Sequence, residues 1–146
     1  MKNLLVVVDM VNGFVKEGAL ADRRIEKIIP AIQAKIEMAK KNGDMIIDFR
    51  DSHTPSDEEL KFYPPHCLKG TVESELIDEL KSYAKDMIDI EKDTTNGFKT
   101  DKMKEIIKNN HFDNIDITGC CTDICVRDLT HSLLKYFAQN GINTSI

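Results

Sequence analysis

The 146-residue sequence lacks the features that mark membrane proteins and nucleic-acid-binding proteins. No apolar run approaches the roughly 20 residues that a transmembrane helix needs, so we expect no membrane span. The formal net charge is −5 and no cluster of lysine and arginine stands alone, which argues against a nucleic-acid partner. The apolar stretch at residues 4–8 is too short for a signal peptide, and no small-residue cleavage site follows it. These absences predict a protein that works in aqueous solution.

Cysteine is scarce as well, with four in the whole chain. So few cysteines in a chain of this length do not suggest a disulfide-built scaffold, so we interpret them as reduced thiols and expect a cytoplasmic protein. Apolar residues make up 41% of the sequence and charged residues 31%, as in ordinary globular proteins. Because this length suffices for one sizeable core, we predict a single domain over residues 1–146.

Apolar, strand-like runs alternate with helical periodicity along the chain. The expected strands are residues 4–8, 45–49, 87–90 and 112–119, and residues 142–146 are expected to begin a fifth. The expected helices are residues 30–42, 73–84, 101–109 and 123–140, with one further helical turn over 23–29. This alternation predicts a three-layer α/β/α sandwich around a mainly parallel sheet.

Residues 116–128 combine a strand end, a tight turn at Gly119 and the start of a helix. Ligands of parallel α/β proteins bind beyond the carboxyl ends of the strands, so such a junction is a place for chemistry. Cys125 falls in the expected first helical turn, where free N–H groups and the helix dipole favour the thiolate over the thiol. It is therefore a candidate nucleophile. The alternative is that the three cysteines of this segment are ordinary core residues.

Two other candidate residues stand at the ends of other strands. Asp9 follows the first strand and Lys92 follows the third. The carboxyl ends of parallel strands meet at one edge of the sheet, so an acid, an amine and the Cys125 thiol can converge there. An ammonium group favours the thiolate, and a carboxylate can take the thiol proton and later return it. The combination predicts a thiol hydrolase.

The stretch of residues 50–70 has no regular period and is rich in candidate metal ligands. They are Asp51, His53, Glu58, Glu59 and His66. Imidazole and carboxylate groups in this combination suit Zn²⁺, Mn²⁺ or Fe²⁺. A long structureless loop in a compact domain is usually functional or disordered. The alternative is a charged surface loop that contains such residues by chance.

Four segments of the chain resemble motifs of the nicotinamidase branch of the isochorismatase-like cysteine hydrolases. They are residues 8–20, residues 51–53 with 64–66, Lys92 with Phe98, and residues 118–126. The segments follow the family's order and extend over nearly the whole chain, so the resemblance is specific. It implies the isochorismatase-like fold.

The resemblance also implies roles for the candidate catalytic residues. Asp9, Lys92 and Cys125 would form a catalytic triad. A non-proline cis peptide bond is expected between Cys120 and Cys121, and the backbone N–H groups of Cys121 and Cys125 would form an oxyanion hole.

A metal site and a ring pocket are implied in the same way. One divalent transition metal (Zn, Mn or Fe) would be held by Asp51, His53, Glu59 and His66. The third histidine that the family often has in this loop is absent, so Glu59 is chosen over Glu58 for its spacing from His66. The walls of the ring pocket would be Phe14, Tyr63 and Phe98.

The implied function is hydrolysis of nicotinamide, and also of pyrazinamide, to the acid and ammonia through a cysteine thioester. Such a reaction belongs to pyridine nucleotide biosynthesis. Two alternatives stay open: another cysteine amidase of the family that acts on a ureido or carbamoyl substrate, and a truncated, inactive domain. Family members continue beyond a fifth strand, so we expect a C-terminal truncation or a sheet edge that a second subunit closes in a homo-oligomer.

Overall fold

A four-stranded parallel sheet forms the centre of the protein in the computed structural model, which describes residues 2–146. Its strands are β1 (Asn3–Val8), β2 (Met45–Asp51), β3 (Ile88–Lys92) and β4 (Asn114–Gly119). They lie in the order β3-β2-β1-β4, and all three pairings are parallel. The sheet confirms the predicted parallel α/β arrangement.

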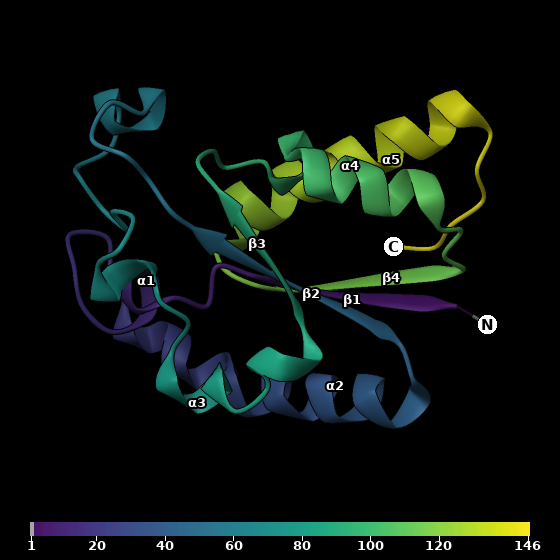
Figure 1. Ribbon diagram of the computed structural model, residues 1–146, viewed down its shortest axis with the longest axis horizontal. Helices are drawn as coiled ribbons and strands as arrows, with labels where there is room; N and C mark the ends of the chain where they lie inside the picture. The colour runs from purple at the N-terminus through teal and green to yellow at the C-terminus, as the bar shows by residue number, and fades with distance from the viewer. Residues whose placement is uncertain (1) are drawn as a thin grey trace.

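Helices cover both faces of the sheet, which completes the predicted three layers (Figure 1). One face carries α1 (Asn12–Val15), α2 (Ile29–Asn42) and α3 (Asp78–Lys81). The other carries α4 (Asp101–Asn109) and α5 (Arg127–Asn140). Within the described residues, no helix is long and apolar enough to cross a membrane.

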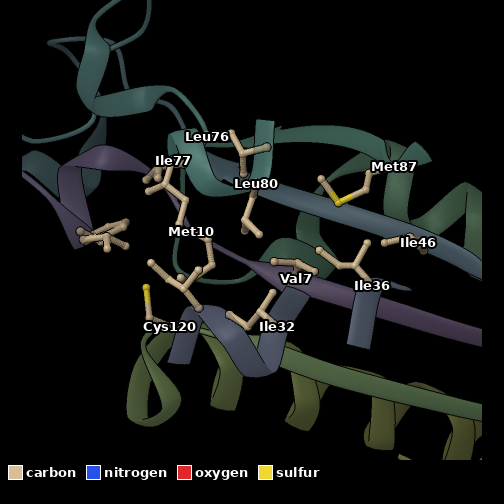
Figure 2. Close-up of a cluster of buried hydrophobic side chains, with 14 of the residues drawn as sticks. Val7, Met10, Ile32, Ile36, Ile46, Leu76, Ile77, Leu80, Met87 and Cys120 are labelled. Carbon is tan, nitrogen blue, oxygen red and sulfur yellow. The ribbon is translucent and has the colours of Figure 1, made fainter. Parts of the chain in front are cut away.

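The unbroken apolar run of β1 is explained by the two cores that it separates. Successive side chains of a strand point to opposite faces. Leu5 and Val7 therefore join the core beneath α2, where Val7 packs near Ile36 (Figure 2). Val6 and its alternate neighbours join the core beneath α4 and α5. A strand that is buried on both faces is apolar at successive positions, which explains the unbroken run.

Two predicted helices have the expected bounds, and their ends show why. Pro30 stands in the first turn of α2, and Gly43 ends that helix with a left-handed φ of 72°. The α4 helix spans the predicted residues, and the Thr100 hydroxyl at its N-cap accepts a hydrogen bond from the Met103 amide.

The predicted helix over residues 73–84 is wrong. Only Asp78–Lys81 is α-helical. Val72–Ser74 forms a short 3-10 helix, and the backbone is extended at Glu75 and Ile77. The amide of Ile77 donates to the carbonyl of Met10, and the carbonyl of Glu75 accepts from the amide of Asn12. Leu76, Ile77 and Leu80 are buried as predicted. Their apolar spacing reflects packing of an extended segment against the loop after β1, and this partner is distant in sequence.

The predicted fifth strand is reduced to one bridge in the described part of the chain. Ser145 pairs with Asn114 in a parallel bridge: the Ile115 amide donates to the Ser145 carbonyl, and the Ser145 amide donates to the Asp113 carbonyl. Two strands are longer or later than predicted, since β2 extends to Asp51 and β3 to Lys92. The longer strands place the side chains of Asp51 and Lys92 at the carboxyl ends of β2 and β3.

Candidate active site and metal cluster

The carboxyl ends of all four strands contribute to one site. Asp9 follows β1, Asp51 ends β2, Lys92 ends β3, and Cys125 lies beyond β4. Asp51 and Lys92 are register partners, so their side chains lie side by side on the same face of the sheet. Asp9 turns away from the strand direction with a φ of +53°, which a non-glycine residue rarely adopts.

The structure brings Asp9, Lys92 and Cys125 together, and all three are buried. The Lys92 Nζ lies 2.7 Å from Asp9 Oδ2 and 3.8 Å from Cys125 Sγ. It also donates to Asp51 Oδ1 at 3.1 Å and to the Thr94 carbonyl at 3.0 Å. Lys92 thus connects the candidate triad to the first of the candidate metal ligands.

Burial dominates the protonation of the acid and the thiol. It raises the pKa of Asp9 to about 6, although the Lys92 ammonium opposes the rise. Burial and the Asp9 carboxylate together raise the pKa of Cys125, and Lys92 only partly offsets them. Cys125 is therefore a thiol in the free site, contrary to the prediction of a thiolate stabilised by the helix start. Both Asp9 oxygens are buried without a well-aligned hydrogen bond, so the carboxylate keeps lone pairs for a proton.

The turn after β4 presents Cys125 and the amide of Cys121. Gly119 has a φ of +118°, and a Cβ there would overlap the Val8 carbonyl of the neighbouring strand. The Cys120–Cys121 peptide bond is cis, as the resemblance implied. Within residues 2–146 we find no hydrogen-bond acceptor for the Cys121 amide. Cys125 lies in a single π-helical turn, Thr122–Val126, rather than in the first turn of an α-helix as predicted, because α5 begins only at Arg127.

The four predicted metal ligands form one compact cluster. One donor atom from each of Asp51, His53, Glu59 and His66 lies within 4.8 Å of the other three. His53 Nε2 is 2.9 Å from Asp51 Oδ2 and 2.7 Å from Glu59 Oε2. His66 Nε2 is 3.2 Å from the same Asp51 oxygen. Glu58 instead points outward and pairs with Lys61, so the geometry favours Glu59, the ligand that was chosen by spacing.

The outer nitrogens of both histidines are fixed by the protein. His53 Nδ1 lies 3.1 Å from Asp57 Oδ2, and His66 Nδ1 donates to the Pro64 carbonyl at 2.7 Å. Both Nε2 atoms therefore face the centre of the cluster, in the manner of metal-bound imidazoles with outer carboxylate or carbonyl partners.

The chemistry of the cluster fits a divalent cation. Burial alone would lower the pKa of His53, but Asp51 and Glu59 raise it to about 10, so the site favours positive charge at its centre. Glu59 Oε2 is buried and accepts no well-aligned hydrogen bond, which leaves it a free lone pair. Two imidazoles and two carboxylates are a suitable ligand set for Zn²⁺, Mn²⁺ or Fe²⁺.

A cavity of about 190 Å³ joins the candidate nucleophile to the cluster. Its wall includes Cys125, Cys121, Asp51, Glu59 and His66, together with the predicted ring contacts Phe14 and Tyr63. Phe98 is not part of this wall. Its ring packs against Tyr136 with the centroids 5.6 Å apart, at the core beneath α5, so the structure does not bring Phe98 to the predicted pocket.

Three further wall residues were missed by the sequence interpretation: Leu20, Thr95 and Ile124. Thr95 and Ile124 follow β3 and β4 closely, so their place after a strand end could have identified them. Leu20 lies in the long loop after β1, and no local pattern indicates that this loop folds back over the site.

Comparison with known proteins identifies the family. The isochorismatase domain matches residues 3–138. Nicotinamidase 1 of Arabidopsis thaliana is 34% identical over an alignment that covers 90% of this chain and 59% of the relative, so the chain spans less than two thirds of that protein.

Two solved structures share the fold. The N-carbamoylsarcosine amidase of Thermoplasma acidophilum is 34% identical with a TM-score of 0.85, over 93% of this chain and 78% of the other. The pyrazinamidase of Pyrococcus horikoshii in complex with zinc is 28% identical with a TM-score of 0.81, over 92% and 79%. The match over nearly the whole chain shows that this protein belongs to the isochorismatase family.

Proposed function

We propose that this chain is a cysteine amidase that hydrolyses nicotinamide to nicotinate and ammonia. One observation carries the proposal: a buried acid, amine and thiol line or adjoin the same small cavity as a four-ligand metal cluster. The similarity to proteins named nicotinamidase and pyrazinamidase supports a heteroaromatic amide as the substrate.

The triad residues supply the acyl chemistry. Asp9 accepts the Cys125 proton, and Cys125 Sγ attacks the amide carbon. Asp9 then returns the proton to the nitrogen, the C–N bond breaks, and ammonia leaves a thioester behind. Asp9 next deprotonates water, which attacks the thioester; the C–S bond breaks, the carboxylic acid is released, and Asp9 returns the proton to the Cys125 sulfur. Lys92 stabilises the anionic forms of both partners from its position between them.

The backbone N–H groups of Cys121 and Cys125 are the proposed donors to the oxyanion. Both residues line the cavity, and the Cys121 amide keeps its donor free among residues 2–146. Loss of one such donor typically costs about 10²- to 10³-fold in rate. The free Cys121 amide beside the nucleophile supports the proposed oxyanion hole.

Asp51, His53, Glu59 and His66 would hold one divalent metal ion. When bound, such an ion supplies a coordination position for a pyridine nitrogen. Phe14 and Tyr63 both line this cavity and would pack against the ring. This combination of ring contacts and ligand atoms is the reason to propose a nitrogen heterocycle.

A second candidate is an amidase of carbamoyl compounds. The observation in its favour is the 34% identity and TM-score of 0.85 with a structure named N-carbamoylsarcosine amidase. The metal cluster counts against it, since a carbamoyl group offers no pyridine nitrogen to coordinate.

Ammonia release by the purified chain tests both candidates. We expect release from nicotinamide, loss of release after treatment with a chelator, and recovery when Zn²⁺, Mn²⁺ or Fe²⁺ is returned. Release from N-carbamoylsarcosine but not from nicotinamide would favour the second candidate. No release from either amide by metal-loaded protein would contradict an amidase function.

A further inference from the structure

A second, larger hollow adjoins the candidate active-site cavity. It has a volume of about 620 Å³ and shares Glu59, Tyr63 and Thr95 with the inner cavity. The rest of its wall is formed by Ser56, Asp57, Glu58, Phe62, Asp93 and Thr94. The wall therefore combines two aromatic rings with four carboxylates.

We call Asp57, Glu58, Glu59 and Asp93 the acidic rim. Among the residues that the structure describes, no arginine or lysine lines either hollow. The two lysines that neighbour these wall residues in the sequence are already paired: Lys61 contacts Glu58 at 2.7 Å, and buried Lys92 contacts Asp9 and Asp51. Asp93 is exposed and makes no ion pair within residues 2–146.

A bound divalent ion would not remove this negative potential. Its charge would offset Asp51 and Glu59, which are its proposed ligands. Asp57, Glu58 and Asp93 lie outside that set and would keep their charges, of which only that of Glu58 is balanced by a lysine.

We propose that the acidic rim makes this site selective for uncharged amides, with Asp93 as a specificity-determining residue. A carboxylate on the substrate would meet the like charges of the acidic rim, and within residues 2–146 no lysine or arginine on either wall balances them. An uncharged ring meets apolar surface instead, because 83% of Phe62 and 37% of Tyr63 is exposed.

The inference rests on the proposed function and deepens it. N-Carbamoylsarcosine carries a carboxylate, so the acidic rim counts against it as a substrate, independently of the metal cluster. Hydrolysis also converts an uncharged amide into an anion. The negative charges of the rim do not repel the substrate, but they weaken binding of the product. The rim thus favours product release.

The test compares two ligands that differ by one charge and one methyl group. They are nicotinamide with a carboxylate on ring carbon 5, and the methyl ester of that compound. Binding is measured by calorimetry at low salt and at high salt. The protein is the full chain with Cys125→Ala, which prevents turnover, so the result does not depend on whether the amide is hydrolysed.

We expect the ester to bind about four-fold more tightly than the acid at low ionic strength, because Asp57 and Asp93 keep unbalanced charges and each unit charge about 10 Å away contributes roughly two-fold. The ratio should fall at high salt. Asp93→Lys changes two units of charge and should reduce the ratio about four-fold. The same charge change on α4, Glu105→Lys, is the matched control and should leave the ratio nearly unchanged, since Glu105 lines neither hollow.

Equal or tighter binding of the acid would overturn the inference, as would a ratio that Asp93→Lys and Glu105→Lys change alike. Failure of the proposed function would look different. In that case the unsubstituted chain would release no ammonia from nicotinamide, whatever the preference for the ester over the acid.

Discussion

At the scale of single residues, burial and ion pairing set the chemistry of the candidate site. Burial favours the neutral forms of both Asp9 and Cys125, and Lys92 opposes this for each of them. Asp9 can therefore act as a base at neutral pH while still holding a proton readily, which a group that takes and returns a proton requires. The Cys125 thiol stays protonated in the free site.

We predict that Cys125 is the only cysteine whose removal abolishes turnover. Cys125→Ala should fold normally and release no ammonia from nicotinamide, because no other thiol lies beside Lys92. Cys67→Ala is the control: Cys67 is fully buried away from the cavity wall and should keep most activity. Circular dichroism checks folding of both. Substantial turnover by Cys125→Ala would contradict the mechanism.

The pKa of Asp9 predicts the acid side of the pH profile. Asp9 must be ionised to accept the thiol proton, and its pKa is raised to about 6. We therefore expect kcat/KM for nicotinamide to rise as pH increases through about 6 and to fall tenfold for each pH unit below it. The measurement is kcat/KM between pH 4.5 and 8 in buffers that do not bind metals. A profile that is flat across this range would exclude Asp9 as the base.

Asp57 should raise the metal affinity without contacting the ion. Its carboxylate faces His53 Nδ1 and so directs Nε2 to the cluster. Removal of such an outer partner typically costs about 10- to 100-fold in metal affinity. Calorimetry with Zn²⁺ should show this loss for Asp57→Ala. Glu58→Ala, one residue on and exposed, should bind as the unchanged chain does. Equal affinities in the two variants would show that His53 needs no outer partner.

At the scale of elements, the sequence predicts the parts whose signal is local. The apolar run of β1, the cap of α4 and the Gly43 end of α2 each depend on residues a few positions apart, and these elements were predicted closely. The helix over 73–84 was wrong because Ile77 bonds to Met10, a contact that no window of local sequence contains. Phe98 was assigned to the pocket by the family resemblance, which does not show that its ring packs against Tyr136 on α5.

The site was predicted more completely than the helices. The carboxyl ends of parallel strands converge whatever the detail of the loops, so Asp9, Lys92 and Cys125 could be placed together from topology. The protonation state of Cys125 could not be foreseen, because it depends on burial and on the position of Asp9.

Strand β2 carries a buried acid that lowers stability at neutral pH. Desolvation raises the pKa of Asp48 to about 7, well above its ordinary value, and its Oδ1 has no hydrogen-bond partner. The folded state therefore binds a proton that the unfolded chain releases, so the free energy of unfolding falls as pH rises from about 4 to about 7.

Asp48→Asn should remove that penalty. We expect it to increase the free energy of unfolding by roughly 2 kcal/mol at pH 8 and by much less at pH 4. Urea denaturation at the two pH values measures the difference. Glu105→Gln, an exposed change of the same charge, is the control and should have little effect at either pH. A loss of stability at pH 8 would show that the Asp48 carboxylate is stabilising.

At the scale of the whole molecule, the two ends of the sheet differ in their relation to the candidate site. The amino ends of the strands bear no part of the candidate site, whereas the carboxyl ends carry the triad, the metal cluster and the acidic rim. In the proposed function the rim would act on the overall charge of a substrate, and the metal cluster would act on one ring atom. The two should therefore be separable in a panel of amides.

We predict that the pyridine nitrogen decides which uncharged ring is used. Nicotinamide and benzamide are nearly isosteric and both uncharged, so Phe14, Tyr63 and the acidic rim should accept either. The two rings differ only in the nitrogen lone pair, which can coordinate a metal ion. That ion would be held by Asp51, His53, Glu59 and His66. A ring without this lone pair is held less firmly, and a misplacement of about 1 Å can cost about 10²-fold in rate.

We therefore expect kcat/KM on metal-loaded protein to be similar for nicotinamide and pyrazinamide and at least about 10²-fold lower for benzamide. His53→Ala should reduce this preference together with the metal content, measured by elemental analysis. If benzamide matches nicotinamide, the cluster does not select the ring and the nicotinamide assignment fails, while the role of Cys125 can still stand.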